Sequence, residues 1–285
     1  MTNNLSYSTI VGTIILYNPL DDTFDNIQSY ITELDMLIIV DNSDIHNVKL
    51  INKIKNQFDK IIYINNFENL GIATALNIAC NKAIELGYQW ILTMDQDSSF
   101  VNFNEYLRCI TKITDKQVVS IISPNSNMPP GISKNCEMSE KTLTITSGAF
   151  LNLTHFEKVG KFTDKLFIDE VDHDYCLRSI EKKLKVLQFF NIPLIHTIGE
   201  KSNYKKKVIT QHNPIRMYYI TRNSFYIVSR FKKSFPERYS YKKTFYKNIY
   251  KTFFKILKQE DYKLLKLKYV CLGIIDFLRG KYGRV

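Results

Sequence analysis

Four short apolar runs in the first hundred residues set the expected architecture of this chain. Each run is apolar at nearly every position and ends in polar residues, which is typical of strands buried on both faces of a parallel sheet. The runs are Thr9–Tyr17, Met36–Asp41, Lys60–Ile64 and Trp90–Met94. Helical spacing of apolar residues fills the gaps, at Asp22–Leu34, Val48–Phe58 and Gly71–Leu86. Strands alternating with helices predict a doubly wound α/β domain with right-handed crossovers.

The middle of the chain has a less regular pattern. Strands are expected at Val118–Ser123 and Thr142–Leu153, and an amphipathic helix at Val171–Leu184. The segment Lys185–His196 is expected to be extended and broken by Pro193, because proline cannot donate to a strand ladder. The proline-rich stretch Ser123–Ser139 is expected to be a loop.

The last third of the chain is strongly basic. From Glu200 onward there are 22 Lys and Arg against 5 Asp and Glu, whereas the whole chain has a net charge of +11. Between Tyr239 and Gln259 an aromatic and apolar face alternates with a lysine face, which predicts an amphipathic helix. The apolar face holds Tyr241, Phe245, Ile249, Phe253 and Ile256, and the other face holds Lys243, Lys247, Lys251, Lys255 and Lys258. Such a helix either lies in a membrane interface or docks on the α/β domain, and both are compatible.

Composition limits the environment of the protein. The longest apolar runs are about half of the roughly 20 residues that a membrane-spanning helix needs, so no span is expected. The start of the sequence has no signal-peptide pattern. The five scattered cysteines are interpreted as small buried residues in a reducing compartment, with neither a disulfide framework nor a zinc site. Cytoplasmic residence is the expectation.

Polar residues follow all four predicted strands of the first hundred residues. They are Tyr17-Asn18-Pro19, Asp41-Asn42-Ser43, Asn65-Asn66 and Asp95-Gln96-Asp97. Ligands bind at the carboxyl ends of strands in open α/β sheets, so these residues are expected to meet around one ligand. No glycine-rich dinucleotide fingerprint and no P-loop occur in the sequence.

Acidic residues supply the candidate chemistry. Asp95 and Asp97 are expected to converge on one hard divalent cation, Mg²⁺ or Mn²⁺; the alternative is a solvated turn. Asp41 is a candidate for contacting a ribose or base, the alternative being an Asx turn or helix cap. Four acids, namely Asp169, Glu170, Asp172 and Asp174, crowd one short stretch. Their mutual repulsion raises at least one pKa and suits a general base, although acids are also common in a first helical turn. His196 alone is a weak candidate.

Taken together, these residues resemble the family-two inverting glycosyltransferases of the GT-A fold, especially the bacterial rhamnosyltransferase-like branch. The resemblance covers nearly the whole chain in the same order. The matching segments are Tyr17-Asn18-Pro19, Val40-Asp41-Asn42, Asn69–Ala73, Ala75-Leu76-Asn77, Leu92–Ser98, Ser147-Gly148, Asp172–Arg178, His212-Asn213-Pro214, Tyr218–Ser224 and Leu272–Lys281.

The resemblance implies a role for each candidate residue. Tyr17, Asn18, Asp41, the Asn69–Gly71 turn, Asp95 and Gln96 bind the nucleotide-sugar, and Asp95, Asp97 and His196 hold the metal. Asp172 is the catalytic base. Val171 stands where relatives commonly have a glutamate, so Asp169, Glu170 and Asp174 stay as alternates.

The resemblance also implies a domain plan and a reaction. A Rossmann-like mixed sheet flanked by helices forms a GT-A catalytic domain over residues 1–211, with a nucleotide-sugar half at about 1–98 and an acceptor half at about 99–211. A basic helical region covers 212–285. The expected reaction moves L-rhamnose from dTDP-rhamnose to a lipid-linked or growing polysaccharide in cell-surface polysaccharide, capsule or O-antigen biosynthesis.

Several alternatives stay open at this point. UDP-linked galactose, glucose or N-acetylglucosamine can replace dTDP-rhamnose as the donor. The expected partner of residues 239–285 is an anionic membrane, at the inner face of the cell membrane, and not nucleic acid. Rivals from other classes are a nucleic-acid-binding protein, a nucleotidyltransferase and a non-catalytic scaffold.

Overall fold

A computed structural model of the protein describes residues 10–126, 135–196, 200–204, 207–244 and 249–285. The chain divides into two compact units. The first comprises Met1–Phe162 and Tyr175–Thr197, and the second comprises Thr163–Asp174 and Ile198–Val285. Each unit is described below by itself.

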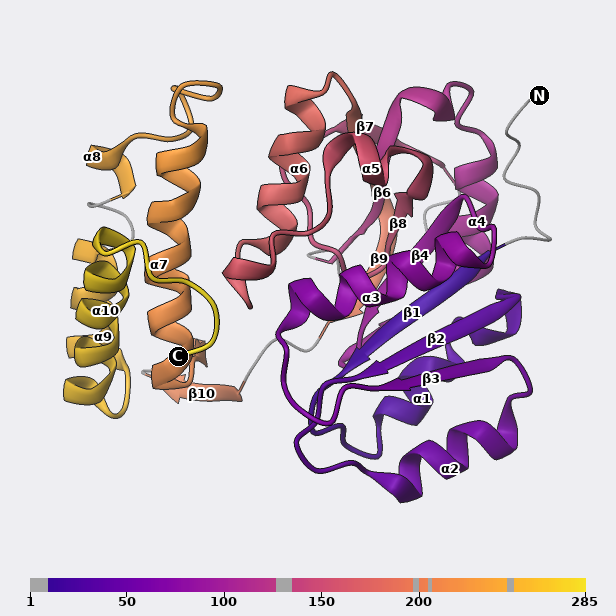
Figure 1. The fold of residues 1–285 in the computed structure, drawn as a ribbon, viewed down its shortest axis with the longest axis horizontal. Coiled ribbons are helices and arrows are strands. Elements are labelled where there is room, and N and C mark those ends of the chain that lie inside the picture. Colours follow the sequence, from indigo (N-terminus) through magenta and orange to yellow (C-terminus); the bar gives the residue numbers. More distant parts are fainter. Residues whose placement is uncertain (1–9, 127–134, 197–199, 205–206, 245–248) are drawn as a thin grey trace. The chain divides into compact units, whose positions relative to one another are not determined.

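The first unit is built on a mixed sheet with the strand order β3-β2-β1-β4-β8-β6-β9-β5, and β7 pairs with β9 (Figure 1). β1, β2, β3 and β4 run parallel to one another, whereas β8 is antiparallel to both β4 and β6. The strands are β1 Val11–Leu16, β2 Met36–Asp41, β3 Ile61–Asn65, β4 Trp90–Asp95, β5 Ser98–Phe100, β6 Val119–Asn125, β7 Met138–Glu140, β8 Ala149–Asn152 and β9 Lys185–His196.

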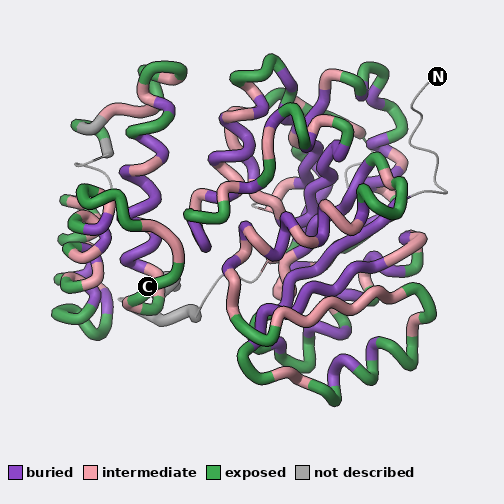
Figure 2. The backbone as a smooth tube through the Cα atoms, viewed as in Figure 1, coloured by how far each residue is buried: buried purple, intermediate pink, exposed green. Residues whose placement is uncertain are grey.

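Helices cover both faces of this sheet. The helices are α1 Thr23–Gln28, α2 Val48–Gln57, α3 Ile72–Glu85, α4 Phe103–Thr111, α5 Phe156–Val159 and α6 Val171–Glu181, with 3-10 turns at Ile31–Glu33, Lys116–Val118 and Leu153–His155. The part of α6 before Tyr175 belongs to the second unit. One apolar cluster joins α1, α2 and α4 to the same side of the strands, and α3 packs against β1 and β2 from outside this cluster. Figure 2 shows the central strands buried and the helices exposing their outer sides.

The α/β alternation predicted for the first hundred residues is confirmed. β2 has the predicted bounds, and β1, β3, β4, α2 and α3 differ from the predictions by one or two residues at an end. The predicted helix Asp22–Leu34 was wrong in extent, because α1 ends at Gln28 and a separate 3-10 turn follows.

Two predictions in the middle of the chain were wrong. Of Thr142–Leu153, only Ala149–Asn152 forms a strand. Lys185–His196 is one strand that continues through Pro193. The pairing of β6 with β9 shifts register between Ser123 and Asn125, and Asn125 lies opposite Pro193. This irregularity accommodates a residue that has no N–H to donate.

The second unit contains a two-stranded sheet and four helices in the part that the structure describes. They are β10 Glu200–Tyr204, β11 Lys207–Gln211, α7 Pro214–Phe231, α8 Tyr241–Thr244, α9 Lys251–Gln259 and α10 Lys263–Leu278, with a 3-10 turn at Asp164–Leu166. α7 and α10 lie side by side (Figure 1). They approach closely at Gly273, where an added Cβ would lie 2.7 Å from the carbonyl oxygen of Tyr218. Among the described residues no helix is both long and apolar enough to span a membrane.

The single helix predicted over Tyr239–Gln259 is not what the structure contains. α8 ends at Thr244 and α9 begins at Lys251. Phe245 and Lys247 of the predicted faces lie outside the described residues. Ile256 is fully buried, whereas Phe253 is 40% exposed, so α9 is docked by part of its apolar face and presents the rest to the surface.

The interpretation of all five cysteines as unpaired buried residues was wrong. Cys109 of α4 forms a disulfide with Cys136, 27 residues later. Among the described residues Cys80 and Cys176 form no disulfide and are buried as expected, whereas Cys271 forms no disulfide but is exposed. The sequence spacing of Cys109 and Cys136 gave no sign of this pairing, because the fold of the intervening chain brings them together.

Gly148 occupies a position that only glycine fits without strain. Its φ is +73°, and an added Cβ would lie 2.7 Å from Cγ of Pro124. Its N–H donates to the carbonyl oxygen of Thr93 at 2.8 Å, and the preceding Ser147 accepts a hydrogen bond from the N–H of Asp95 at 3.2 Å. This glycine therefore allows the chain before β8 to support the end of β4.

We expect Gly148→Ala to lower the free energy of unfolding by about 2–3 kcal/mol, because left-handed backbone strain and a steric clash act together. Gly87→Ala is the matched control, since Gly87 also has a positive φ (84°) but nothing within 4 Å of its added Cβ. That control should cost only about 1 kcal/mol. Urea unfolding of both variants measures the difference; equal losses would show that the contact with Pro124 is unimportant.

Candidate active site

The loops that follow β1 and β4 are joined by a reciprocal pair of hydrogen bonds. The N–H of Tyr17 donates to Oε1 of Gln96 at 2.8 Å, and Nε2 of Gln96 donates to the carbonyl oxygen of Tyr17 at 3.0 Å. Ile15 lies opposite Asp95 in the pairing of β1 with β4, so both loops leave the sheet at the same edge. The candidate residues Tyr17, Asp95 and Gln96 thus lie together at the carboxyl ends of parallel strands, where ligands bind in open α/β sheets.

The loop after β2 joins the same edge. The N–H of Asn18 donates to Oγ of Ser43 at 2.8 Å, and Nδ2 of Asn42 donates to the carbonyl oxygen of Gly71 at 3.1 Å. Oδ1 of Asn69 in turn accepts from the N–H of Gly71 at 2.9 Å. Gly71 has a φ of 84° and caps the N-terminus of α3. The Asn69–Gly71 turn is therefore fixed to the strand ends by side-chain amides.

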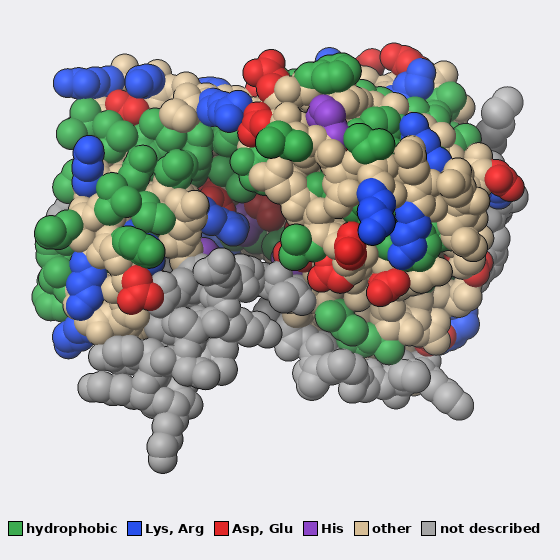
Figure 3. Space-filling model, turned by 90° about the horizontal axis from the view of Figure 1, so that it is seen from below, with side chains coloured by type: hydrophobic (Ala, Val, Ile, Leu, Met, Phe, Trp, Pro, Cys, Tyr) green, Lys and Arg blue, Asp and Glu red, His purple; other side chains and the backbone are tan. Residues whose placement is uncertain are grey.

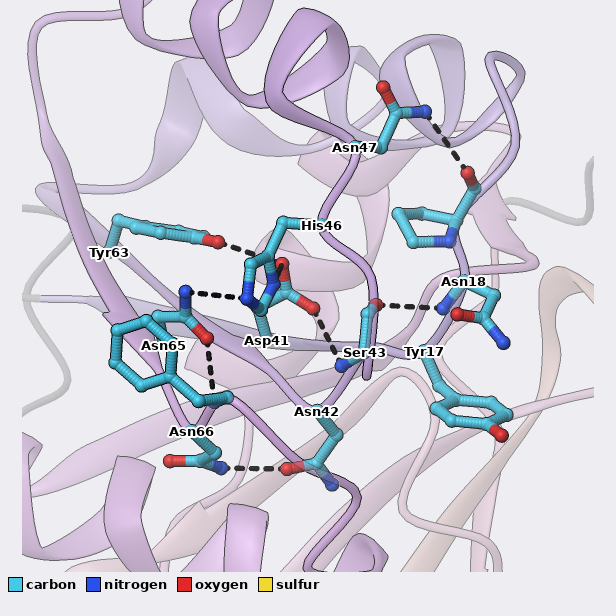
Figure 4. A network of polar contacts seen from close by, with 12 residues as sticks. Tyr17, Asn18, Asp41, Asn42, Ser43, His46, Asn47, Tyr63, Asn65 and Asn66 are labelled. Atoms are coloured by element: carbon cyan, nitrogen blue, oxygen red, sulfur yellow. Dashed lines mark hydrogen bonds and ion pairs between the residues drawn. The ribbon is translucent and has the colours of Figure 1, made fainter.

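Asp41 lies at the centre of this network and is fully buried (Figure 4). Its Oδ1 accepts from the N–H of Ser43 at 2.9 Å, and its Oδ2 accepts from the hydroxyl of Tyr63 at 2.7 Å. Nδ1 of His46 lies 3.4 Å from Oδ2. Burial and the hydrogen bond to Asp41 raise the pKa of the Tyr63 hydroxyl, so Tyr63 stays a donor. Both carboxylate oxygens thus have protein partners, and the side chain shapes the loop after β2.

Tyr63 and His46 are the members of this network that the sequence did not single out. Tyr63 comes from β3, which pairs with β2 in parallel and places Asn65 opposite Asp41. Nδ2 of Asn65 lies 3.0 Å from Nε2 of His46. The sequence does predict that β2 and β3 are neighbouring parallel strands. Which residue of β3 lies beside Asp41 depends on the register of their pairing, and a single sequence does not reveal this register.

Asp95, Asp97 and His196 form a separate cluster in the same unit. Nε2 of His196 lies 3.6 Å from Oδ2 of Asp95 and 3.3 Å from Oδ1 of Asp97. One ligand atom from each of the three residues lies within 4.8 Å of the others. The antiparallel pairing of β5 with β9 explains this, because it sets Ser98 opposite His196 and so brings the histidine beside the acidic triplet.

The cluster suits a divalent cation. Oδ1 of Asp97 is buried and accepts no hydrogen bond from the described residues, although Nε2 of His196 lies 3.3 Å away, and a carboxylate oxygen in this setting is costly unless a cation satisfies it. Two carboxylates and one imidazole are ligands that Mn²⁺ accepts, and Mg²⁺ takes the carboxylates. The three residues therefore fit the expected ion.

Three of the four crowded acids have side-chain partners within the second unit. Oδ1 of Asp169 accepts from Arg216 at 3.0 Å, and Oδ2 of Asp174 accepts from the hydroxyl of Thr163 at 2.7 Å. Oε2 of Glu170 lies 2.7 Å from Nδ1 of His173. The fourth acid, Asp172, accepts from the N–H of His173 at 2.8 Å in the first turn of α6. The four acids are thus close in sequence but differ in environment.

These environments shift two pKa values in directions that matter for proton transfer. Burial is the main cause that raises the pKa of Asp172, while the neighbouring His173 opposes the shift. Burial also disfavours charge on His173, but the charge of Asp172 and the hydrogen bond to Glu170 outweigh it and raise the pKa of His173 to about 9. At neutral pH the imidazole of His173 is therefore protonated and positively charged. Asp172 is a stronger base than an ordinary aspartate.

Two comparisons at the level of sequence relate the chain to known proteins. The family model described as glycosyl transferase family 2 matches residues 11–162. The dTDP-rhamnosyl transferase RfbF of Shigella flexneri is 29% identical over 300 residues, which cover 97% of this chain and 97% of that protein.

Solved structures share the fold at low sequence identity. TarS 1–349 of S. aureus in complex with UDP-GlcNAc has a TM-score of 0.60 at 13% identity and covers 95% of this chain and 81% of its own. The mannosyltransferase PcManGT of Pyrobaculum calidifontis with GDP-Man and Mn²⁺ has a TM-score of 0.58 at 11% identity, covering 97% and 76%. GalNAc-T7 with UDP, GalNAc and Mn²⁺ has a TM-score of 0.59 at 13% identity; it covers 81% of this chain, which spans about half of GalNAc-T7 (51%).

The family model covers more than half of the chain, and the mixed sheet with its flanking helices is the one found in these transferases. The chain therefore belongs to glycosyl transferase family 2 and is a glycosyltransferase with the GT-A fold.

Proposed function

We propose that this glycosyltransferase moves L-rhamnose from dTDP-rhamnose to a glycan or glycolipid acceptor with inversion, in the synthesis of a cell-surface polysaccharide. The observation that carries the donor assignment is the similarity to the Shigella dTDP-rhamnosyl transferase along almost the whole of both chains. A UDP-hexose is the alternative donor, since UDP-GlcNAc is the ligand of the similar TarS structure. The residues at the ends of β1 to β4 bind the nucleotide diphosphate in either case.

The proposal includes a divalent ion held by Asp95, Asp97 and His196. It is supported by the closeness of their ligand atoms and by the buried Oδ1 of Asp97, which accepts no hydrogen bond from the described residues. When bound, Mn²⁺ or Mg²⁺ supplies positive charge to the diphosphate as it leaves. Gln96 holds the loop after β1 beside this cluster. Ser147 accepts from the N–H of Asp95 and so orients the end of β4.

Asp172 is the proposed general base. Asp169 is committed to Arg216, Glu170 to His173, and Asp174 is fully buried against Thr163. Asp172 is partly exposed and has a raised pKa, which suits the acceptance of a proton from an acceptor hydroxyl. The hydroxyl oxygen then bonds to the anomeric carbon as the bond to the diphosphate oxygen breaks, and the configuration inverts.

The metal site is tested by Mn²⁺ binding in the absence of turnover. Asp97→Asn and His196→Ala should each raise the Kd for Mn²⁺ at least about tenfold, because each removes a ligand worth at least about 1.4 kcal/mol. Electron paramagnetic resonance of free Mn²⁺, with the nucleoside diphosphate present, measures this Kd. Asp59→Asn, at an exposed aspartate in the connection between α2 and β3, is the control. Wild-type affinity in both variants would exclude this site.

The base is tested by Asp172→Asn. We expect kcat to fall by about 10²-fold or more, while the Kd for the donor stays within about twofold, because proton transfer is lost and the donor contacts are kept. In the wild type, kcat should fall as the pH drops through the pKa of Asp172, which lies above the ordinary aspartate value of 3.8. Turnover assays over a range of pH measure kcat, and calorimetric titration measures the Kd for the donor. Full turnover in the variant would exclude Asp172 as the base.

We also propose that α9 and α10 bind the anionic surface of the cell membrane from its inner face. Apolar side chains on these helices are exposed, including Phe253 (40%), Phe254 (41%) and Leu264 (85%). Lys251 and Lys258 of α9 are exposed as well. Figure 3 shows hydrophobic side chains beside Lys and Arg on the surface of this unit. Apolar groups enter the acyl boundary while lysines meet anionic head groups, which is the usual mode of interfacial helices.

Vesicle binding separates this proposal from nucleic-acid binding. Sedimentation with phosphatidylglycerol vesicles should capture the protein, and Phe254→Ser with Leu264→Ser should weaken the binding about tenfold, because less apolar area is buried. Leu86→Ser, an exposed leucine at the end of α3, should leave vesicle binding unchanged. If the protein instead prefers random duplex DNA or RNA over these vesicles, the result would favour nucleic-acid binding by this region.

A further inference from the structure

The chain just before Asp172 has an unusually strained backbone. Phe167, Asp169 and Glu170 have φ values of 67°, 61° and 65°, in the left-handed region that side chains other than glycine rarely adopt. Each such residue costs on the order of 1–3 kcal/mol and persists only where the surroundings impose it. The second unit must therefore contain groups that hold this segment in place.

Asn223 of α7 is one of these groups. Its Nδ2 lies within hydrogen-bond distance of three carbonyl oxygens of the strained backbone. The acceptors are the carbonyl oxygens of Leu166 at 2.9 Å, Ile168 at 2.7 Å and Asp169 at 3.0 Å. Asn223 is fully buried, so its two N–H groups are shared among these three carbonyl oxygens in place of water.

Arg222, the neighbouring residue, fixes the orientation of that amide. Its Nε donates to Oδ1 of Asn223 at 3.0 Å, which forces Nδ2 to face the carbonyl oxygens. One terminal nitrogen donates to the carbonyl oxygens of Lys165 and Leu166, at 3.2 Å and 3.1 Å. The other donates to the hydroxyl of Tyr218 and the carbonyl oxygen of Gly283. All five N–H groups of the guanidinium thus have an acceptor.

The charge of Arg222 is accommodated without exposure to solvent. Arg222 is fully buried, and its guanidinium lies 5.1 Å from the ring centroids of Tyr218 and Tyr219. The hydroxyl of Tyr218 in turn donates to Oδ2 of Asp276 on α10 at 2.9 Å. A buried cation surrounded by rings and fully hydrogen-bonded is costly to alter, which favours a specific role for this side chain.

We propose that Arg222 and Asn223 are positioning residues for the general base: they hold the backbone of residues 165–169 in the strained form that sets the place of Asp172. This inference rests on the proposed role of Asp172. They act on Asp172 through the backbone and are therefore distinct from the catalytic residue itself. The basic C-terminal region thereby contributes to the chemical step as well as to surface charge.

Asn223→Asp tests the proposal with almost no change of shape. The variant places a carboxylate oxygen against three carbonyl oxygens, so the strained segment should relax and displace Asp172. We expect kcat to fall about 100-fold, the loss typical of a misplacement of about 1 Å, while the Kd for the nucleotide-sugar changes less than about twofold. Asn213→Asp is the matched control, because exposed Asn213 caps α7 through Oδ1 and an aspartate keeps that acceptor.

Arg222→Lys is the second variant. It keeps the positive charge but removes the planar guanidinium and its five N–H donors. It should also lower kcat and shift the acid limb of the kcat–pH profile, which a merely structural change elsewhere would not do. Arg230→Lys, an exposed arginine of the same helix, is its control and should leave both readouts unchanged. Circular dichroism and donor binding establish that each variant is folded; if Asn223→Asp does not fold, Arg222→Lys decides.

The outcomes distinguish a failure of the positioning role from a failure of the proposed base. Wild-type kcat and pH profile in folded Asn223→Asp or Arg222→Lys, with Asp172→Asn inactive, would overturn the positioning role alone. Full activity of Asp172→Asn would instead overturn the proposed base. Asn223→Asp introduced into Asp172→Asn should cause no further loss of turnover, because both changes remove the same contribution. An additive further loss would also contradict the proposal.

Discussion

The parallel alignment of β1, β2, β3 and β4 is the constraint on which the first unit depends. Parallel strands end at one edge of the sheet, so the polar residues that follow each strand are gathered there regardless of their distance in sequence. Tyr17 and Gln96 are 79 positions apart and still exchange two hydrogen bonds. The sheet therefore supplies the geometry, and short side chains such as Asn42 and Ser43 only fix the loops onto it.

The metal cluster needs a second element that the parallel strands do not provide. His196 ends β9, which lies beyond β8 and β6 in the sheet and reaches the acidic triplet only because β5 turns back and pairs with it. A slip of the β5–β9 register by one residue would turn the side chain of His196 to the opposite face. The register of the β5–β9 pairing, in which Phe100 lies opposite Leu194, therefore determines whether His196 is available as the third metal ligand.

How much could be predicted from the sequence depends on how far apart along the chain the interacting residues lie. Local apolar pattern predicted β1 to β4, α2 and α3, and the strand-end rule led to Asp95 and Asp97. The disulfide of Cys109 with Cys136, the continuity of β9 through Pro193, and Tyr63 beside Asp41 depend on register and on chain segments far apart. The roles of the candidate site residues stay predictions, as does the division into 1–211 and 212–285.

Charge in the second unit is divided between structure and surface, which limits what its net value implies. Lys266 is almost fully buried, lies 2.8 Å from Oε2 of Glu260, and leaves no charge for a partner. Lys255 lies 2.9 Å from the other oxygen of the same carboxylate. Burial opposes ionisation of Glu260, but hydrogen bonds from both lysines outweigh it and lower its pKa. Removing either lysine therefore unbalances the ionised Glu260, whereas Lys251 and Lys258 are exposed and contribute to the charge that a charged surface meets. An excess of basic residues counted from sequence thus overstates the charge that an anionic partner meets.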